Sequence, residues 1–189
     1  NVTSINVTCN GANDGRITIS GATGGYGTYE YSASGGASWQ ASGTFTNLAP
    51  GSYNVQIRDA AHTGCIIVLT PALVITEPAV LTATVASVNI TCFGANNGII
   101  TITGAAGGYG TYEYTINGGT NWSGLNNFSN LAPGTYNVRI RDAANIACTA
   151  TLNPALVITQ PAVLTAVVTK TNVTCFGGSD GTITITNPT

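Results

Sequence analysis

Charged side chains are scarce in this sequence. Lys and Arg total 5, Asp and Glu total 7, and the formal net charge is −2 over 189 residues. Proteins that bind nucleic acid neutralise phosphates with Lys and Arg, and this term supplies much of their affinity. A chain with five basic residues is therefore not expected to bind nucleic acid. The weak charge also argues against attraction to an acidic membrane surface.

Long apolar runs are absent as well. The stretch from Pro71 to Leu81 is among the longest, and Thr, Glu and Pro interrupt it. A membrane-spanning helix needs about 18 or more apolar residues, so no membrane insertion is expected. No secretory leader begins at Asn1, and we expect the chain to be an internal or mature segment of a longer protein.

Catalytic side chains are equally few. His62 is the only histidine, and Asn145 takes its place 83 residues later. A nucleophile needs a base that a third group orients, and a single histidine without a repeat counterpart is typical of an exposed loop. The carboxylates Glu30, Asp59 and Glu77 are spread over different segments, whereas acid–base pairs need a fixed short separation. We expect no enzyme activity and no cofactor.

The Asn-Asp-Gly sequence at 13–15 could suggest a calcium loop, because carboxylate oxygens bind calcium. The second copy of this sequence, Asn96-Asn97-Gly98, contains no acid. Calcium takes 6–8 oxygen ligands, so a turn is the better interpretation and no metal is expected. The Gly-Gly-Tyr-Gly sequence at 24–27 is not followed by a helix that could hold a phosphate, and it is interpreted as a loop.

What the sequence does contain is an internal repeat. Cys9 recurs as Cys92 and Cys175, with offsets of 92 − 9 = 83 and 175 − 92 = 83. The same offset relates the other marked positions of the two copies, which are Tyr26 and Tyr109, Trp39 and Trp122, Pro50 and Pro133, Arg58 and Arg141, Cys65 and Cys148, and Pro78 and Pro161. The chain therefore holds two nearly whole units and the beginning of a third.

We divide the chain into a first repeat at 1–78, a second at 79–161 and the N-terminal part of a third at 162–189. The joints are TEPAVLTA at Thr76–Ala83 and TQPAVLTA at Thr159–Ala166. Each joint places a proline between two extended apolar runs, so it is short and stiff rather than flexible. The array is expected to be a semi-rigid rod in which neighbouring repeats of the same chain contact each other.

Period-2 alternation predicts strands in each unit. Ile17 and Ile19 share one face, and Tyr53, Val55 and Ile57 share another. Gly, Pro and Asn punctuate these runs at turn positions, and no stretch has a helical period. The predicted fold class is all-β, as tandem immunoglobulin-like Greek-key β-sandwiches.

Two side-chain interactions are predicted within each sandwich. Tyr53 and Tyr136 follow a Pro-Gly turn, where a corner tyrosine can bond back to the backbone of the turn. Glu30 and Arg58 point outwards from two strands, and they form a cross-strand pair if those strands are neighbours. Glu113 and Arg141 would repeat this pair.

Trp39, Trp122, Tyr26 and Tyr109 are the candidates for stacking on a sugar. The alternative is that each tryptophan packs over the core or the edge of its sandwich. Both interpretations remain open at this point.

The order of motifs resembles the SprB-type repeat of very large surface adhesins of Bacteroidetes bacteria. The residues that carry the resemblance are Thr8-Cys9-Asn10-Gly11 with Asp14-Gly15, Tyr29 and Tyr31, Phe45 to Asp59, Cys65, and Ile75 to Pro78. The resemblance implies export, display on the bacterial outer surface and many copies, and it brings no catalytic residues.

The leading hypothesis is a non-catalytic structural and adhesive array, acting as a stalk and as a multivalent adhesin. Many weak sites in one array can produce strong avidity. One alternative is a subunit of a self-assembling extracellular filament or sheath, in which like chains pair. Another is a carbohydrate-binding module that contacts surface glycans through the aromatic residues above.

Five cysteines in an exported chain indicate disulfides. We predict that Cys9 pairs with Cys65 and Cys92 with Cys148, so that each unit is closed on itself and Cys175 is left over. The rival scheme joins Cys65 to Cys92 and Cys148 to Cys175 across the joints. The extended chain between Cys65 and Cys92 disfavours that rival, because bridged Cα atoms lie within about 7 Å.

Overall fold

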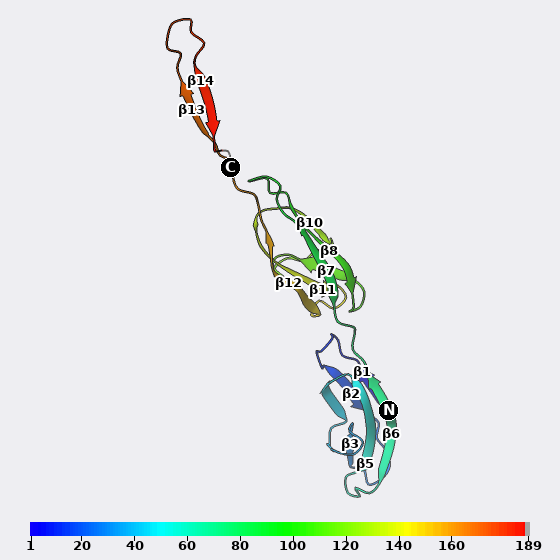
Figure 1. The fold of residues 1–189 in the computed structure, drawn as a ribbon. Helices are drawn as coiled ribbons and strands as arrows, with labels where there is room; N and C mark the ends of the chain where they lie inside the picture. The colour runs from blue at the N-terminus through cyan, green and yellow to red at the C-terminus, as the bar shows by residue number, and fades with distance from the viewer. Residues whose placement is uncertain (188–189) are drawn as a thin grey trace.

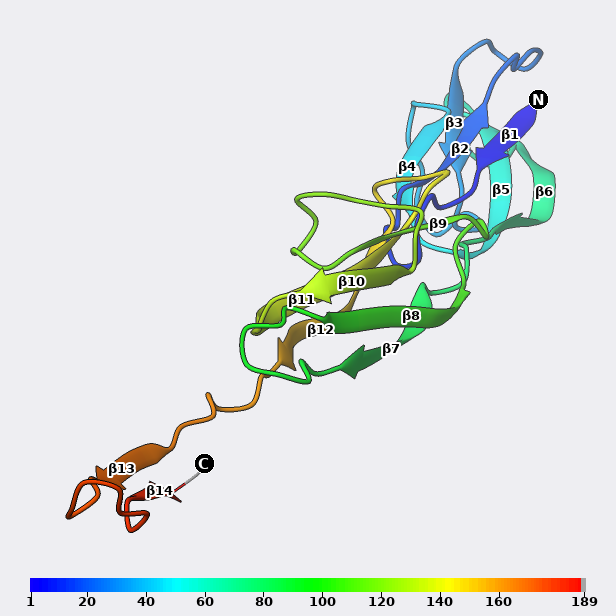
Figure 2. The same cartoon turned by 90° about the horizontal axis from the view of Figure 1, so that it is seen from above.

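The computed structural model describes residues 1–187, and this part of the chain contains strands and turns but no helix. Three parts follow one another along a rod: two sandwiches and a hairpin (Figure 1). Seen from above, the hairpin again lies beyond the second sandwich, joined to it by a single extended segment (Figure 2). In residues 1–187 no helix exists that could cross a membrane.

The first unit consists of six strands in two three-stranded antiparallel sheets. One sheet has the order β1-β2-β4, and the other has the order β3-β5-β6. The strands are β1 (Val2–Ile5), β2 (Gly15–Ile19), β3 (Tyr29–Ser32), β4 (Thr44–Leu48), β5 (Gly51–Asp59) and β6 (Ile66–Ile75).

The second unit repeats this arrangement with the orders β10-β8-β7 and β12-β11-β9. Its strands are β7 (Thr82–Val88), β8 (Gly98–Ala106), β9 (Tyr112–Thr115), β10 (Asn127–Leu131), β11 (Gly134–Asp142) and β12 (Thr149–Ile158). The partial third unit is the hairpin of β13 (Val167–Thr171) and β14 (Thr182–Thr186), which corresponds to the first two strands of each sandwich.

The chain changes sheet between β2 and β3 and again between β3 and β4 and between β4 and β5, which is the Greek-key path of an immunoglobulin-like sandwich. The predicted fold class is therefore confirmed. Turn chemistry explains these connections, since Pro and Gly close the corner between β4 and β5.

The core of each unit lies between its two sheets. In β2 the residues alternate between buried and more exposed, so Ile17 and Ile19 point inwards as predicted. Val55 from the opposite sheet and Ile75 at the end of β6 complete the centre of the first core. The second core uses the counterparts Ile100, Ile102, Val138 and Ile158 and also includes Leu81 from the joint.

Both side-chain predictions for the sandwich are confirmed. The Tyr53 hydroxyl donates to the Ala49 carbonyl at 2.8 Å, and Tyr136 donates to Ala132 at the same distance. Glu30 lies opposite Arg58 in the β3–β5 ladder, with 2.7 Å between Oε2 and Nη2. Glu113 and Arg141 repeat the pair at 2.6 Å.

Candidate functional site: the joint between the sandwiches

The first component of the joint is the cysteine loop, residues 8–14, which connects β1 to β2. Asp14 closes this loop, because its carboxylate accepts hydrogen bonds from both the amide and the hydroxyl of Thr8. Asn97 closes the second cysteine loop, residues 91–97, through the same two groups of Thr91. The Asn-Asp-Gly sequence thus has a structural role that an amide can also fill.

Hydrogen bonding also sets the charge state of this turn. The hydroxyl of Thr8, and then its amide, hold the pKa of Asp14 below the ordinary value of 3.8. Thr174 lowers the pKa of Asp180 in the third cysteine loop, residues 174–180, in the same way. These acids stay ionised in neutral water and keep the loop closed.

The second component is the end face of each unit, formed by the loops after β2 and β5 in the first unit. We define it by Gly25, Tyr26, His62 and Cys65 in the first unit and by Gly108, Tyr109, Asn145 and Cys148 in the second. In the second unit the buried carboxylate of Asp142 accepts hydrogen bonds from the amides of Tyr109, Ala144 and Asn145, which ties the two loops together.

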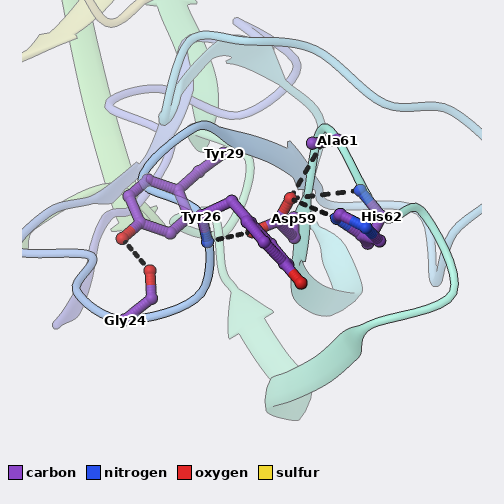
Figure 3. Close-up of polar contacts among 6 residues, drawn as sticks. All are labelled: Gly24, Tyr26, Tyr29, Asp59, Ala61 and His62. Atoms are coloured by element: carbon purple, nitrogen blue, oxygen red, sulfur yellow. Dashed lines mark hydrogen bonds and ion pairs between the residues drawn. The ribbon is translucent and has the colours of Figure 1, made fainter.

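The first unit builds its end face by the same means (Figure 3). Asp59 accepts hydrogen bonds from the amides of Tyr26 at 2.7 Å, Ala61 at 2.9 Å and His62 at 3.1 Å. The bond from Tyr26 lowers the pKa of Asp59 most. The Tyr26 ring stacks on His62, with ring centroids 4.0 Å apart.

Glycine is required beside these aspartates. Gly25 and Gly108 have φ values of 59° and 57°, which side chains rarely adopt. A Cβ at Gly108 would lie 2.4 Å from Oδ2 of Asp142, and one at Gly25 would lie 2.5 Å from Oδ2 of Asp59. The Gly-Gly-Tyr-Gly sequence therefore lets the loop approach the carboxylate closely.

The cysteine loop of the first unit docks on the end face of the second. The Thr8 carbonyl accepts a hydrogen bond from the Tyr109 hydroxyl at 3.1 Å and another from Nδ2 of Asn145 at 3.3 Å. Cys9 packs against the core of the second unit. Apolar packing and two polar contacts therefore connect the sandwiches directly.

A disulfide completes this contact: it joins Cys9 of the first unit to Cys148 of the second, with Cα atoms 5.2 Å apart. This corrects both pairing schemes. The predicted bonds Cys9–Cys65 and Cys92–Cys148 do not form, and neither does the rival Cys65–Cys92 or Cys148–Cys175. Cys65, Cys92 and Cys175 are free and exposed.

The physical reason lies in the two ends of the sandwich. The cysteine loop projects from the end of the first unit nearest the second, whereas the loop between β5 and β6 lies at the far end (Figure 1). Gly11 in the cysteine loop donates to Glu77 at 2.7 Å, which places that loop beside the joint. Cys65 lies between β5 and β6, so Cys9 reaches the equivalent position of the next unit instead.

The linker between the units is held on both sides. Nδ2 of Asn10 donates to the Pro78 carbonyl at 3.2 Å, and the Gly108 amide donates to the Ala79 carbonyl at 2.9 Å. Leu81 is buried in the second core. The peptide between β6 and β7 therefore belongs to the interface and is not a free tether.

Each tryptophan packs against an arginine of its own unit. Arg58 covers one face of Trp39, with its Cζ 4.4 Å from the ring centroid, and Arg141 covers Trp122 at 4.6 Å. Both indoles are half-buried. Each unit thus carries a Trp–Arg–Glu cluster at the same place on its surface, formed by Trp39, Arg58 and Glu30 in the first unit.

The remaining chemical candidates are dispersed. His62 lies in the exposed loop after β5, and its Nδ1 is 3.9 Å from Oδ1 of Asp59. In residues 1–187 no group of three or more His, Cys, Asp or Glu side chains is placed to hold a metal ion. Of the predicted aromatic contacts, the structure brings Tyr109 to the joint and Tyr26 to the exposed end face.

Sequence reasoning missed the contact between the cysteine loop of the first unit and the end face of the second. The signal was present, because Thr8, Gly108 and Leu81 all belong to motifs that recur at the 83-residue offset. The sequence did not reveal their role in the contact between the sandwiches, because each motif also has an explanation within a single sandwich.

Comparison with known proteins identifies a sequence family and similar solved structures. The sequence model of the SprB repeat matches residues 1–38, 84–121 and 167–189, which together are more than half of the chain. Among solved structures, the C-terminal 282-residue fragment of intimin, crystallised with the intimin-binding domain of the translocated intimin receptor, is similar with a TM-score of 0.41 and 16% identity. That match covers 88% of this chain and 65% of the intimin chain. A search of curated proteins found no match.

Proposed function

This chain belongs to the SprB repeat family, and we propose that it is a non-catalytic stalk segment of a bacterial surface protein that also presents weak adhesive sites in many copies. Family membership supports the tandem arrangement and the surface location. The observation that carries the stalk role is the covalent and hydrogen-bonded joint between the two sandwiches.

A stalk must resist bending between its units. The linker segment is bound to the first unit through Asn10 and to the second through Gly108, and the Cys9–Cys148 bond clamps the sandwiches a second time. Two connections between rigid bodies restrict rotation far more than one. The units therefore hold their relative direction, which is what spaces a binding tip away from a cell.

Small-angle scattering tests the stalk role on the chain itself. The oxidised chain should give the maximum dimension of a straight two-unit rod with a protruding hairpin, at every protein concentration. A broad distribution of shorter distances, as two freely hinged sandwiches would give, contradicts the proposal. Ordered lateral or end-to-end lattices in electron micrographs would favour the filament instead.

The adhesive role is supported by the Trp–Arg–Glu clusters. Each half-buried indole is held in place by its arginine, and the arginine is held by a glutamate at 2.6–2.7 Å. Indoles fixed at a protein surface bury much area at little entropic cost, and we propose that Trp39 and Trp122 contact surface glycans. The repeat multiplies a weak contact into avidity.

Glycan arrays with a multimeric display of the chain test this second role. Binding should fall when Trp122→Ala and Trp39→Ala are combined, with the β-sheet circular dichroism unchanged. The matched control is Tyr109→Phe, which alters the joint and leaves both clusters intact. Undiminished binding by the double variant would contradict the glycan role without affecting the stalk role.

A further inference from the structure

The hollow at the joint is lined by two sets of residues, one from the cysteine loop and the linker and the other from the end face of the second unit. The first set is Cys9, Asn10 and Pro78–Leu81. Its counterparts at the 83-residue offset, Cys92, Phe93 and Pro161–Leu164, line a second hollow at the far end of the second unit. That end therefore carries one half of a joint.

The other half of the joint appears at the opposite end of the molecule. At the joint the second unit contributes Gly108 and Ala147–Ala150. Their counterparts, Gly25 and Gly64–Ile67, line a hollow on the end face of the first unit. Tyr26 and His62 stand on this same face, exposed above Asp59 (Figure 3).

Equivalent side chains differ in solvent exposure between the occupied joint and the two free ends. Leu81 is 8% exposed because the second unit covers it, whereas its counterpart Leu164 is 87% exposed beside the partial third unit. Cys148 is 5% exposed under the cysteine loop, whereas Cys65 is exposed. Apolar groups that are buried in one copy and open to water in the other indicate a surface that lacks its partner.

We propose that both free ends bind a further copy of the repeat and that each such contact is sealed by a disulfide. Cys92 would bond to the counterpart of Cys148 in a following unit, and Cys65 to the counterpart of Cys9 in a preceding unit. Each unit would then carry one bond to each neighbour. This inference deepens the proposed stalk role and rests on it.

The polar contacts fit the same partner. The Thr91 carbonyl occupies the place of the Thr8 carbonyl, in a loop that Asn97 closes in the same way. At the joint, the Tyr109 hydroxyl and Nδ2 of Asn145 donate to the cysteine loop. On the free end face, the counterparts of these two donors are the Tyr26 hydroxyl and the His62 ring N–H. Ile66 and Ile67 make this face more apolar than its counterpart, which has Thr149 and Ala150.

Each new bond forms by thiol–disulfide exchange. The two thiols lose two protons and two electrons, and an oxidised disulfide, of a small thiol or of an exchange protein, takes up the electrons and becomes two thiols. The close approach that the docked loop imposes selects the pair, since the observed bond has Cα atoms 5.2 Å apart.

The resulting ladder would limit how far an array can be stretched. Each bond bypasses 139 residues of backbone, from Cys9 to Cys148. The next bond of this kind along the chain starts at Cys175, which follows Cys148 at a sequence separation of 175 − 148 = 27. A pulled array would therefore extend through only about 27 residues for every two units, because the remaining backbone lies inside closed loops.

A chain extended at its C-terminus by a copy of residues 107–166 tests the first end, because the 83-residue period makes this copy complete the third unit. After refolding with oxidised and reduced glutathione, peptide mapping without reduction should recover Cys92 linked to the copied Cys148, together with Cys9 linked to Cys148. A bond from the copied Cys148 to Cys175, or a Cys92 that stays free, would overturn the proposal. In the Cys92→Ser version the copied Cys148 should remain a thiol.

A chain preceded by a copy of residues 1–83 tests the other end independently. Here the copied Cys9 should be found linked to Cys65, and Cys65 should lose its reactivity toward iodoacetamide. Hydrogen exchange supplies a readout without sulfur chemistry: amides at 159–166 should become protected in the C-terminally extended chain, even with Cys92→Ser. Two results would refute the docking: unchanged hydrogen exchange at 159–166 in the C-terminally extended chain, and a Cys65 that still reacts with iodoacetamide in the N-terminally extended chain. The scattering result for the 189-residue chain would stand in either case.

Discussion

Cys9 and Cys148 belong to different sandwiches, yet they form the one disulfide among residues 1–187, across 139 residues of chain. Cys148 is buried, and Cys9 packs against the core of the neighbouring unit. The bond is therefore both a covalent link and part of the packing at the joint.

The first prediction is the pairing itself. Iodoacetamide should label Cys65, Cys92 and Cys175 in the native oxidised chain, and a peptide linking Cys9 to Cys148 should be recovered without reduction. A linked peptide joining Cys9 to Cys65 would show that the bond closes a unit on itself.

Cys9→Ser should lower the free energy of unfolding of the second unit by about 2–4 kcal/mol, as the loss of a long closed loop does.

The second prediction concerns force applied through the two termini. The closed loop hides 139 residues, which correspond to about 460–500 Å of extended chain. Pulling the oxidised chain in an optical trap should therefore release only the segments outside Cys9 and Cys148. Cys9→Ser should release the hidden length without any reductant. If the oxidised protein and this variant gave equal contour lengths, the bond would not lie in the force path.

The third prediction concerns acid stability. The pKa of Asp59 is lowered below 3.8, first by the hydrogen bond from the Tyr26 amide and then by those from Ala61 and His62. A carboxyl group whose pKa is lower in the folded than in the unfolded protein stabilises the fold at pH values above its unfolded pKa. This stabilisation is lost as the pH falls through the folded pKa. The first unit should thus lose stability progressively below about pH 4.

Asp59→Asn isolates this contribution. In a Trp122→Phe background the fluorescence of Trp39 reports the first unit alone. The asparagine variant should be less stable at pH 7 and should show a smaller loss on acidification, with the remaining loss due partly to Asp14, whose pKa is also lowered. If the stability of the two proteins depended on pH in the same way, Asp59 would not contribute to the acid sensitivity of the first unit.

The fourth prediction concerns Gly108, where a Cβ would lie 2.4 Å from Oδ2 of Asp142 and φ is 57°. A left-handed conformation by itself costs an alanine about 1–2 kcal/mol, and Gly108→Ala should destabilise the second unit by more than this. Gly110→Ala is the control, because φ is 90° there and no atom lies within 4 Å of the added Cβ. Denaturant unfolding in a Trp39→Phe background measures both, and equal losses would argue against the close approach.

The fifth prediction concerns the corner tyrosine. Tyr136→Phe removes the hydroxyl that donates to the Ala132 carbonyl at 2.8 Å. The free energy of unfolding should fall by about 0.5–1.5 kcal/mol, the net value of one hydrogen bond. Tyr109→Phe provides a comparison, since its hydroxyl contacts the neighbouring unit and its loss should leave the stability of an isolated sandwich unchanged.

The sequence by itself determined the repeat, the fold class and the local side-chain contacts. Ile17 and Ile19 alternate with polar residues because a strand places successive side chains on opposite faces. Tyr53 follows a Pro-Gly turn, and Glu30 and Arg58 sit on neighbouring strands. Each of these features depends on residues close in sequence or on the order of strands, so a pattern along the chain is sufficient to find it.

Only the tertiary structure decided the joint and the disulfide. Counting cysteines left one orphan under any scheme, and spacing alone could not tell which end of a sandwich each loop occupies. The Greek-key path sends the cysteine loop to one end and the loop between β5 and β6 to the other. Cys9 therefore lies beyond the reach of Cys65 and beside Cys148, a relationship that arises only when two folded units are stacked.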